Sequence, residues 1–167
     1  MTHLDTCYLI AFIDKSDDMH RSHKRDIVRA TESKNKHEAY KITMPAIGEA
    51  FHKINEKRNA ARKRDAFKTL EDLLNRGVIE VVGLGVSRDV FRYAREIMDE
   101  CGDEYPNSKV TPMDALITAN AIVDCECVKL YTEDNTLTMN SKLHSIIDEA
   151  RTHLGYDKKL TICSFEY

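Results

Sequence analysis

The hydrophobic and polar positions alternate between short apolar runs and longer amphipathic segments. The short, β-rich runs predict strands over residues 2–5, 40–44, 78–84, 127–131 and 159–165. Apolar residues recurring every three to four positions predict helices over residues 45–54, 53–76, 88–100, 112–123 and 141–154. Strands that alternate with helices are typical of an α/β fold with a central, largely parallel sheet.

Two N-terminal segments follow this pattern less closely. Residues 6–13 are apolar throughout, and periodicity leaves open whether they continue the first strand or form a helix. Residues 17–36 are highly charged with few apolar positions, which indicates a solvated helix. In the amphipathic segments, the apolar stripes place Phe51, Phe67 and Phe91 on the buried faces.

The most informative stretch runs from Thr111 to Asn135. Thr111 suits a helix N-cap, Pro112 suits the first helical position, and the helix after them is apolar almost all round. Asp114 is unusual because it shares a helical face with apolar residues. A short strand follows and ends in the polar sequence Thr-Glu-Asp-Asn, residues 132–135. In α/β sheets, ligands bind at the carboxyl ends of the strands.

Composition limits the class of protein. A chain of 167 residues suits a single domain, here 1–167, with a sizeable core. We expect no membrane partner, because no apolar run has membrane-spanning length, and the N-terminus lacks the basic region of a signal peptide. The five cysteines have no framework spacing, so reduced thiols in a cytoplasmic protein are favoured over disulfides or a zinc site at Cys125 and Cys127.

Net charge says little about a nucleic-acid partner, because the formal value is only −3. The distribution of charge is more informative. The densest basic run is a candidate surface for a phosphate backbone, and it comprises Lys57, Arg58, Arg62, Lys63 and Arg64. An ordinary solvated helix explains the same run equally well.

Four acidic residues stand out, and each has a local explanation. Asp5 and Asp134 suit helix N-caps, and Asp114 suits a capping box with Thr111. Glu49 lies four residues before a lysine, which suits a helical ion pair.

A functional explanation arises when the acids are taken together. Three of them lie at a strand end or a helix start, which meet at one edge of a parallel sheet. Converging carboxylates repel and raise one another's pKa, and a hard divalent cation such as Mg²⁺ or Mn²⁺ relieves that repulsion. Such a site suits phosphodiester hydrolysis.

The order of these motifs resembles the PIN-domain family of nucleases. The matching pieces are Leu4-Asp5-Thr6, Glu49 in MPAIGEAF, Asp114 in MDALITANA and Thr132-x-Asp134 in YTEDN. The resemblance covers nearly the whole chain and implies a three-layer α/β/α fold. It further implies a divalent-metal-dependent endoribonuclease in which a metal-activated water attacks RNA in line, leaving a 5′-phosphate and a 3′-hydroxyl.

Site roles are implied by the same resemblance. Asp5, Glu49, Asp114 and Asp134 would be the catalytic, metal-binding acids, while Thr6 and Thr132 would orient carboxylates or phosphate around them. Glu133 and Asn135 flank Asp134, so either of them could share its role. VapC-type toxins in the family pair with a small antitoxin, and PIN domains commonly form homodimers. Both a toxin and an RNA-processing enzyme therefore fit.

The sequence departs from the family in its first strand, which is shorter than usual and carries His3. The charged helices at 17–36 and 53–76 also look longer than in the smallest toxins. One alternative function is a non-catalytic PIN-like scaffold that binds RNA or protein. A phosphatase with an aspartyl nucleophile is disfavoured because Cys7 stands where that chemistry needs a second acid.

Overall fold

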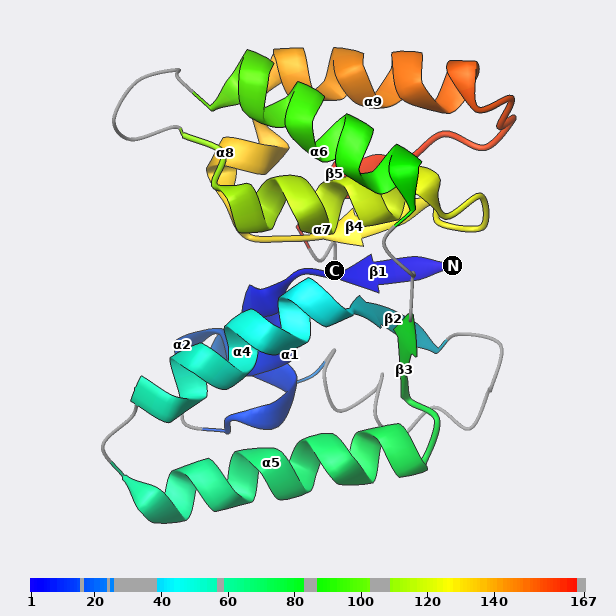
Figure 1. Cartoon of the computed structure of the whole chain (residues 1–167). Coiled ribbons are helices and arrows are strands. Elements are labelled where there is room, and N and C mark those ends of the chain that lie inside the picture. The colour runs from blue at the N-terminus through cyan, green and yellow to red at the C-terminus, as the bar shows by residue number, and fades with distance from the viewer. Residues whose placement is uncertain are drawn as a thin grey trace.

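Strand pairing defines the fold in the computed structural model, which describes residues 1–15, 17–23, 25, 39–56, 59–82, 87–102 and 109–164. The described strands are β1 (Thr2–Leu4), β2 (Tyr40–Thr43), β3 (Ile79–Val82), β4 (Lys129–Tyr131) and β5 (Thr161–Cys163). They form one five-stranded sheet in the order β3-β2-β1-β4-β5, and every pair is parallel (Figure 1). In the register, Leu4 lies opposite both Ile42 and Tyr131. The predicted α/β class is confirmed.

Helices cover both faces of this sheet. The described helices are α1 (Thr6–Ile13), α2 (Asp18–Ser22), α4 (Met44–Glu56), α5 (Ala60–Asn75), α6 (Arg88–Cys101), α7 (Pro112–Val123), α8 (Asn135–Thr138) and α9 (Ser141–His153). Helices α1, α4 and α5 contact one another, as do α6, α7 and α9, and the two groups occupy the lower and upper halves of Figure 1. Helix α4 also packs against α7. The result is a three-layer, PIN-like architecture.

Residues 6–13 form a helix, which settles the choice that periodicity left open. Asp5 adopts an extended backbone conformation and accepts a hydrogen bond from the Thr6 backbone N–H, so α1 begins directly after β1. Seven of the eight residues of α1 are buried. A helix that is apolar all round belongs in the core, and α1 packs against α4 and α5.

Two of the predicted helices differ from those in the structure. The helix predicted over 53–76 is two helices, because Asn59 caps a new one by accepting from the backbone N–H groups of Ala61 and Arg62 at 3.0 and 3.3 Å. Helix α2 occupies only part of the helix predicted over 17–36. Residues 24 and 26–36 of that segment lie outside the described residues.

The three phenylalanines predicted to be buried are exposed: 41% of Phe51, 38% of Phe67 and 56% of Phe91. Phe51 on α4 and Phe67 on α5 instead pack edge to face, with ring centroids 5.0 Å apart. The residue before each phenylalanine takes the inward position instead. Ala50, Ala66 and Val90 are buried, so the larger rings that follow them lie at the rim.

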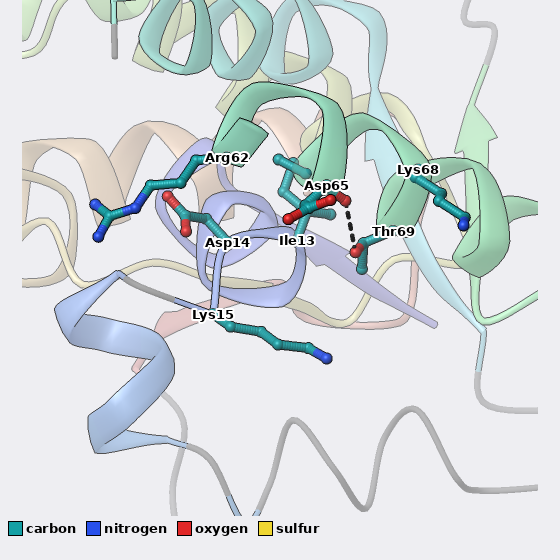
Figure 2. A pocket seen from close by; sticks show the side chains of 8 residues that line it. Ile13, Asp14, Lys15, Arg62, Asp65, Lys68 and Thr69 are labelled. Atoms are coloured by element: carbon teal, nitrogen blue, oxygen red, sulfur yellow. Dashed lines mark hydrogen bonds between the residues drawn. The ribbon is translucent and has the colours of Figure 1, made fainter. Parts of the chain in front are cut away.

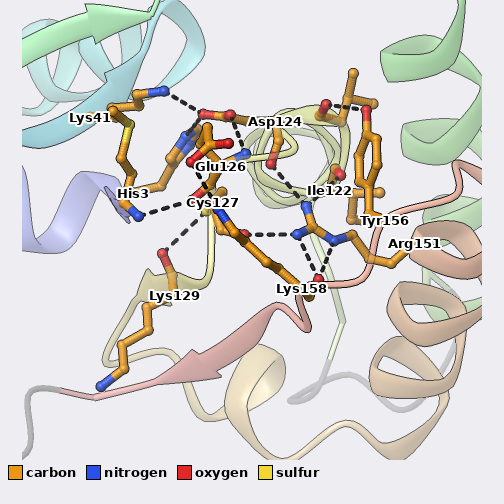
Figure 3. A network of polar contacts seen from close by, with 12 residues as sticks. His3, Lys41, Ile122, Asp124, Glu126, Cys127, Lys129, Arg151, Tyr156 and Lys158 are labelled. Atoms are coloured by element: carbon orange, nitrogen blue, oxygen red, sulfur yellow. Dashed lines mark hydrogen bonds and ion pairs between the residues drawn. The ribbon is translucent and has the colours of Figure 1, made fainter.

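The amino edge of the sheet is held by a polar network around the end of α7 (Figure 3). The Asp124 carboxylate at the C-cap accepts from His3 Nε2 at 2.9 Å and from Lys41 Nζ at 2.8 Å. The hydrogen bond from His3, supported by that from Lys41, outweighs burial and holds the pKa of Asp124 well below its usual range. Strands β1 and β2 are thereby tied to α7.

Arg151 on α9 is the second part of this network and is only 3% exposed. Its guanidinium donates to the carbonyl oxygens of Ile122, Asp124, Cys127 and Lys158 at 2.8 to 3.1 Å (Figure 3). A cation here also complements the negative end of the α7 dipole. Arg151 therefore joins α7, the start of β4 and the turn before β5.

None of the helices in the described part of the chain is both long and apolar enough to cross a membrane.

Candidate functional site

The opposite, carboxyl edge of the sheet carries the predicted acids. Asp5 directly follows β1, and its backbone N–H extends the pairing by donating to Tyr131 O at 3.0 Å. Asp134 lies just beyond β4 and caps α8. Glu49 lies on α4, which follows β2, and Asp114 lies in the first turn of α7, whose other end contacts the amino edge. Four separate elements thus contribute one acid each.

Asp5 is the most buried of the four, at 5% exposure. Its Oδ1 accepts from the Thr6 backbone N–H at 2.6 Å, and its Oδ2 accepts from the Thr132 hydroxyl at 2.7 Å. The Cys7 thiol also donates to Oδ2, at 3.5 Å. Burial raises the pKa of this thiol to about 12, with the Asp5 charge as the next cause, so the thiol stays protonated as a donor.

Glu49 uses both carboxylate oxygens. Oε2 accepts from the Thr6 hydroxyl at 2.7 Å, and Oε1 pairs with Lys53 Nζ at 2.6 Å. The Thr6 residue is 1% exposed, so its contact draws Glu49 toward the start of α1. The helical ion pair with Lys53 is therefore present, and the bond to Thr6 brings Glu49 to the side of the sheet where Asp5 lies.

Asp114 and Asp134 each bond through one oxygen. Asp114 Oδ2 accepts from the Thr111 hydroxyl at 2.6 Å and backbone N–H at 3.0 Å, which completes a capping box. Asp134 Oδ1 accepts from the backbone N–H and the hydroxyl of Thr136, both at 2.7 Å. Within the described residues, the second oxygen of each carboxylate accepts no hydrogen bond.

The charges of these acids influence one another across the carboxyl edge of the sheet. Burial raises the pKa of Asp114 above its usual range, its hydrogen bonds from Thr111 oppose the rise, and the charges of Asp134 and Glu49 add to it. Burial likewise raises the pKa of Asp5, against the hydrogen bonds from Thr132 and Thr6, and the charge of Asp114 raises it further. Asp114 therefore lies at the electrostatic centre of the cluster.

The chemistry of this donor set fits a hard divalent cation. It offers carboxylate oxygens, two of them without hydrogen bonds, from groups whose like charges disfavour one another. The present side-chain positions are not those of a finished coordination shell, since no three His, Cys, Asp or Glu side chains among the described residues are grouped closely enough to hold a metal. Glu49 is held by Thr6 and Lys53 instead.

The polar residues expected around the acids have distinct positions. Thr6 and Thr132 contact Glu49 and Asp5 as described, and the Thr132 hydroxyl also accepts from the Asp134 backbone N–H at 3.0 Å. Asn135 is exposed and is the first residue of α8. Glu133 turns toward α1 and α2, where it bonds to the Tyr8 hydroxyl and lies 3.5 Å from His23 Nε2. Of residues 133–135, Asp134 is therefore the one whose charge acts on Asp114.

The predicted basic surface lies at the corner between α4 and α5. Lys57 and Arg58 are outside the described residues. Lys63 Nζ donates to the Asn55 backbone O at 2.6 Å and thus caps the end of α4, while Arg64 is exposed. Arg62 lines a surface pocket of about 350 Å³ with acidic neighbours, Asp14 and Asp65 (Figure 2).

Two residues of the site were not assigned a role there from sequence. Lys53 brings an ammonium group to the cluster and interacts electrostatically with Asp5 as well as Glu49. Cys7 contributes a thiol beside Asp5. The i, i+4 spacing from Glu49 signals the first contact of Lys53, but its influence on Asp5 depends on how α4 packs against α1.

Comparison with known proteins supports the fold. No family model and no curated protein sequence matches the chain. Among solved structures, the chain is similar to one in the crystal structure of VapBC2 from Rickettsia felis bound to a DNA fragment from their promoter, with a TM-score of 0.56 and 18% identity. The match covers 85% of this chain and 94% of that chain. At this identity the similarity establishes a shared PIN-like fold.

Proposed function

We propose that the protein is a divalent-metal-dependent endoribonuclease whose active site is the acid cluster at the carboxyl edge of the sheet. The observation that carries the proposal is that four acids from four separate elements lie at this edge, where Asp114 and Asp134 each use only one carboxylate oxygen for hydrogen bonds within the described residues. The mutual influence of their charges is consistent with this arrangement. Like charges concentrated at the ligand-binding edge of an α/β sheet are costly to the fold, and a cation-dependent function accounts for their presence.

Each side chain has a role in this proposal. Asp5, Asp114, Asp134 and Glu49 hold Mg²⁺ or Mn²⁺, while Thr6 and Thr132 orient Glu49 and Asp5 through the hydrogen bonds described above. The bound cation would supply an activated water and stabilise the charge that develops on the scissile phosphate. Hydrolysis would leave a 5′-phosphate and a 3′-hydroxyl.

Two partners belong to the same proposal. RNA would contact the basic corner between α4 and α5 through exposed arginines, Arg62 and Arg64.

The structural neighbour is part of a VapBC2 assembly, so we propose by analogy that a small antitoxin-like protein covers the acid edge and that the chain forms homodimers. Size-exclusion chromatography with light scattering tests the homodimer, and a dimer absent at all concentrations contradicts it. Co-purification from the native cell tests the protein partner, and recovery of this chain alone contradicts it.

The decisive experiment is cleavage of a mixed single-stranded RNA pool with Mg²⁺, with Mn²⁺ and with EDTA. Asp114→Asn keeps the size and capping capacity of the side chain but removes the central charge. We expect the cleavage rate to fall at least about 100-fold, the size typical of losing one electrostatic contributor to a transition state. Asp148→Asn on α9, an exposed position, is the matched control and should cleave like the unmodified protein.

Equal cleavage by the Asp114→Asn protein would refute the assignment of the acids. RNA binding without cleavage in any metal would instead favour a PIN-like binding scaffold.

A further inference from the structure

Lys53 differs from the other basic residues of the described chain in where its charge lies. Its ammonium contacts Glu49 Oε1 at 2.6 Å, and its electrostatic influence reaches Asp5, the N-cap of α1. The Glu49 side chain is only 21% exposed, and its other oxygen is bonded to the buried Thr6. An ion pair on a solvated helix face has no such connection to a second helix.

A second helical ion pair gives the comparison. Asp72 and Arg76 on α5 have the same i, i+4 spacing, with an N–O distance of 3.2 Å and exposures of 60% and 48%. That pair lies at the C-terminal end of α5 and is an ordinary solvated pair, worth a few tenths of a kcal/mol. Lys53, itself 46% exposed, is therefore distinguished by its acid partner, since Glu49 is 21% exposed and also bonded to the buried Thr6, rather than by its spacing or its own exposure.

The charges of the cluster indicate what Lys53 does there. Four carboxylates share this edge, and Lys53 is the cation that the described structure brings into direct contact with one of them. Lys53 binds the carboxylate of Glu49, an acid that the proposed function assigns to the metal. Its positive charge also lowers the negative potential that would attract a divalent cation.

We propose that Lys53 is a built-in counter-ion of the acid cluster that competes with the divalent cation, so that the ion pair with Glu49 sets how tightly the site binds metal. This inference rests on the proposed function. It concerns the regulation of the site by cation concentration. Lys53 is a positioning residue, because it acts through Glu49.

The test measures metal binding rather than catalysis. Lys53→Met removes the charge and keeps the aliphatic stem, Lys53→Arg keeps the charge, and Arg76→Met removes a charge from the comparison pair. Mn²⁺ is titrated into each metal-free protein, and free Mn²⁺ is counted by electron paramagnetic resonance. We expect the Kd for Mn²⁺ to fall about tenfold in Lys53→Met, from the loss of one repulsive charge close to a divalent ion. It should stay within about twofold in Lys53→Arg and Arg76→Met.

The salt dependence of the Kd for Mn²⁺ distinguishes an electrostatic role of Lys53 from a purely structural one. The difference in Kd between Lys53→Met and the unmodified protein should shrink at high ionic strength, because the competition is electrostatic. Melting curves of the metal-free variants confirm that each remains folded.

The outcomes separate this inference from the proposed function. Metal binding that is lost in Asp114→Asn but unchanged, or weakened, in Lys53→Met overturns the inference and leaves the nuclease proposal standing. Absence of Mn²⁺ binding in every variant overturns both. Binding that appears or tightens in Lys53→Met alone supports the inference.

Discussion

At the scale of single residues, three acids of the cluster are helix caps as well as members of the proposed site. Asp5 and Asp134 cap α1 and α8, and Asp114 completes the capping box of α7. A capping carboxylate accepts a backbone N–H through one oxygen, and the positive end of the helix dipole stabilises its negative charge. This stabilisation partly compensates the repulsion among the acids. The local and functional explanations of these residues are therefore compatible, and the sequence could not choose between them because both need the same side chains.

Asp5 provides the first prediction at this scale. Its folded-state pKa is raised, chiefly by burial, so its contribution to stability is fully present below the ordinary carboxyl pKa and is lost as pH rises through the folded-state value. In Asp5→Asn, which retains a good N-cap, that loss disappears. The metal-free variant should match the unmodified protein near pH 4 and melt at a higher temperature at pH 7. Each 1 kcal/mol gained corresponds to about 2–4 °C.

Thermal melts followed by circular dichroism in EDTA from pH 4 to pH 8 check this. Asp157→Asn changes an exposed position before β5. Its melting temperature should differ from that of the unmodified protein by the same amount at every pH. If Asp5→Asn instead melted lower at pH 7 than at pH 4, relative to the unmodified protein, the Asp5 carboxylate would be stabilising and the sign would be wrong.

At the scale of elements, patterning predicted all five strand positions and the apolar helix after Thr111, because each rests on local periodicity and caps. Patterning failed at Phe51, Phe67 and Phe91, because the preceding residues Ala50, Ala66 and Val90 take the buried positions of these helix faces. Two aspects of the candidate site also depend on tertiary packing. One is the hydrogen bond from Thr6 to Glu49, and the other is the influence of Lys53 on Asp5.

The junction of α7, β4 and α9 gives a prediction about elements. Arg151→Met leaves the carbonyls of Ile122, Asp124, Cys127 and Lys158 without their buried donor, and unsatisfied buried groups are costly. We expect a decrease of about 3 kcal/mol or more in the free energy of unfolding, or at least about 6–12 °C in melting temperature for a chain of this size.

Urea denaturation measures this decrease directly. Lys158→Met is a suitable comparison, because it removes only an exposed ion pair with Glu126, with side chains 52% and 53% exposed. Exposed pairs contribute about 0–1 kcal/mol. Equal decreases in the two variants would show that the guanidinium hydrogen bonds do not stabilise the junction.

At the scale of the whole molecule, the two edges of the sheet differ in electrostatic character. At the amino edge, the Asp124 carboxylate accepts hydrogen bonds from His3 and Lys41, and the Arg151 guanidinium donates to backbone carbonyls. The carboxyl edge concentrates acids and leaves Asp114 with a raised pKa. One edge therefore stabilises the fold, while the other carries the charge that the proposed chemistry requires.

The distribution of basic residues leads to a prediction at this scale. In the inactive Asp114→Asn background, replacing Arg62 and Arg64 with Ala should weaken single-stranded RNA binding. Its salt dependence should also flatten, by about 0.7 in log–log slope for each RNA phosphate that the protein no longer neutralises. Fluorescence anisotropy at several salt concentrations measures this slope. Arg88→Ala with Arg95→Ala on α6 makes the same change in net charge elsewhere, and an equal effect there would exclude a specific basic corner.

The central position of β1 in the sheet has a consequence for synthesis of the chain. β1 pairs with both β2 and β4, and the hydrogen bond from Thr132 to Asp5 joins residues 127 positions apart. A chain emerging from the ribosome carries Asp5 and Glu49 long before β4 exists, and Asp114 shortly before it, but until then it has neither the partner strand nor the hydroxyl that complete the edge. Such late closure is slow because a long loop must be ordered first. A translation product that stops before residue 129 therefore contains three of the four acids but lacks an assembled site, so premature termination does not release the proposed activity.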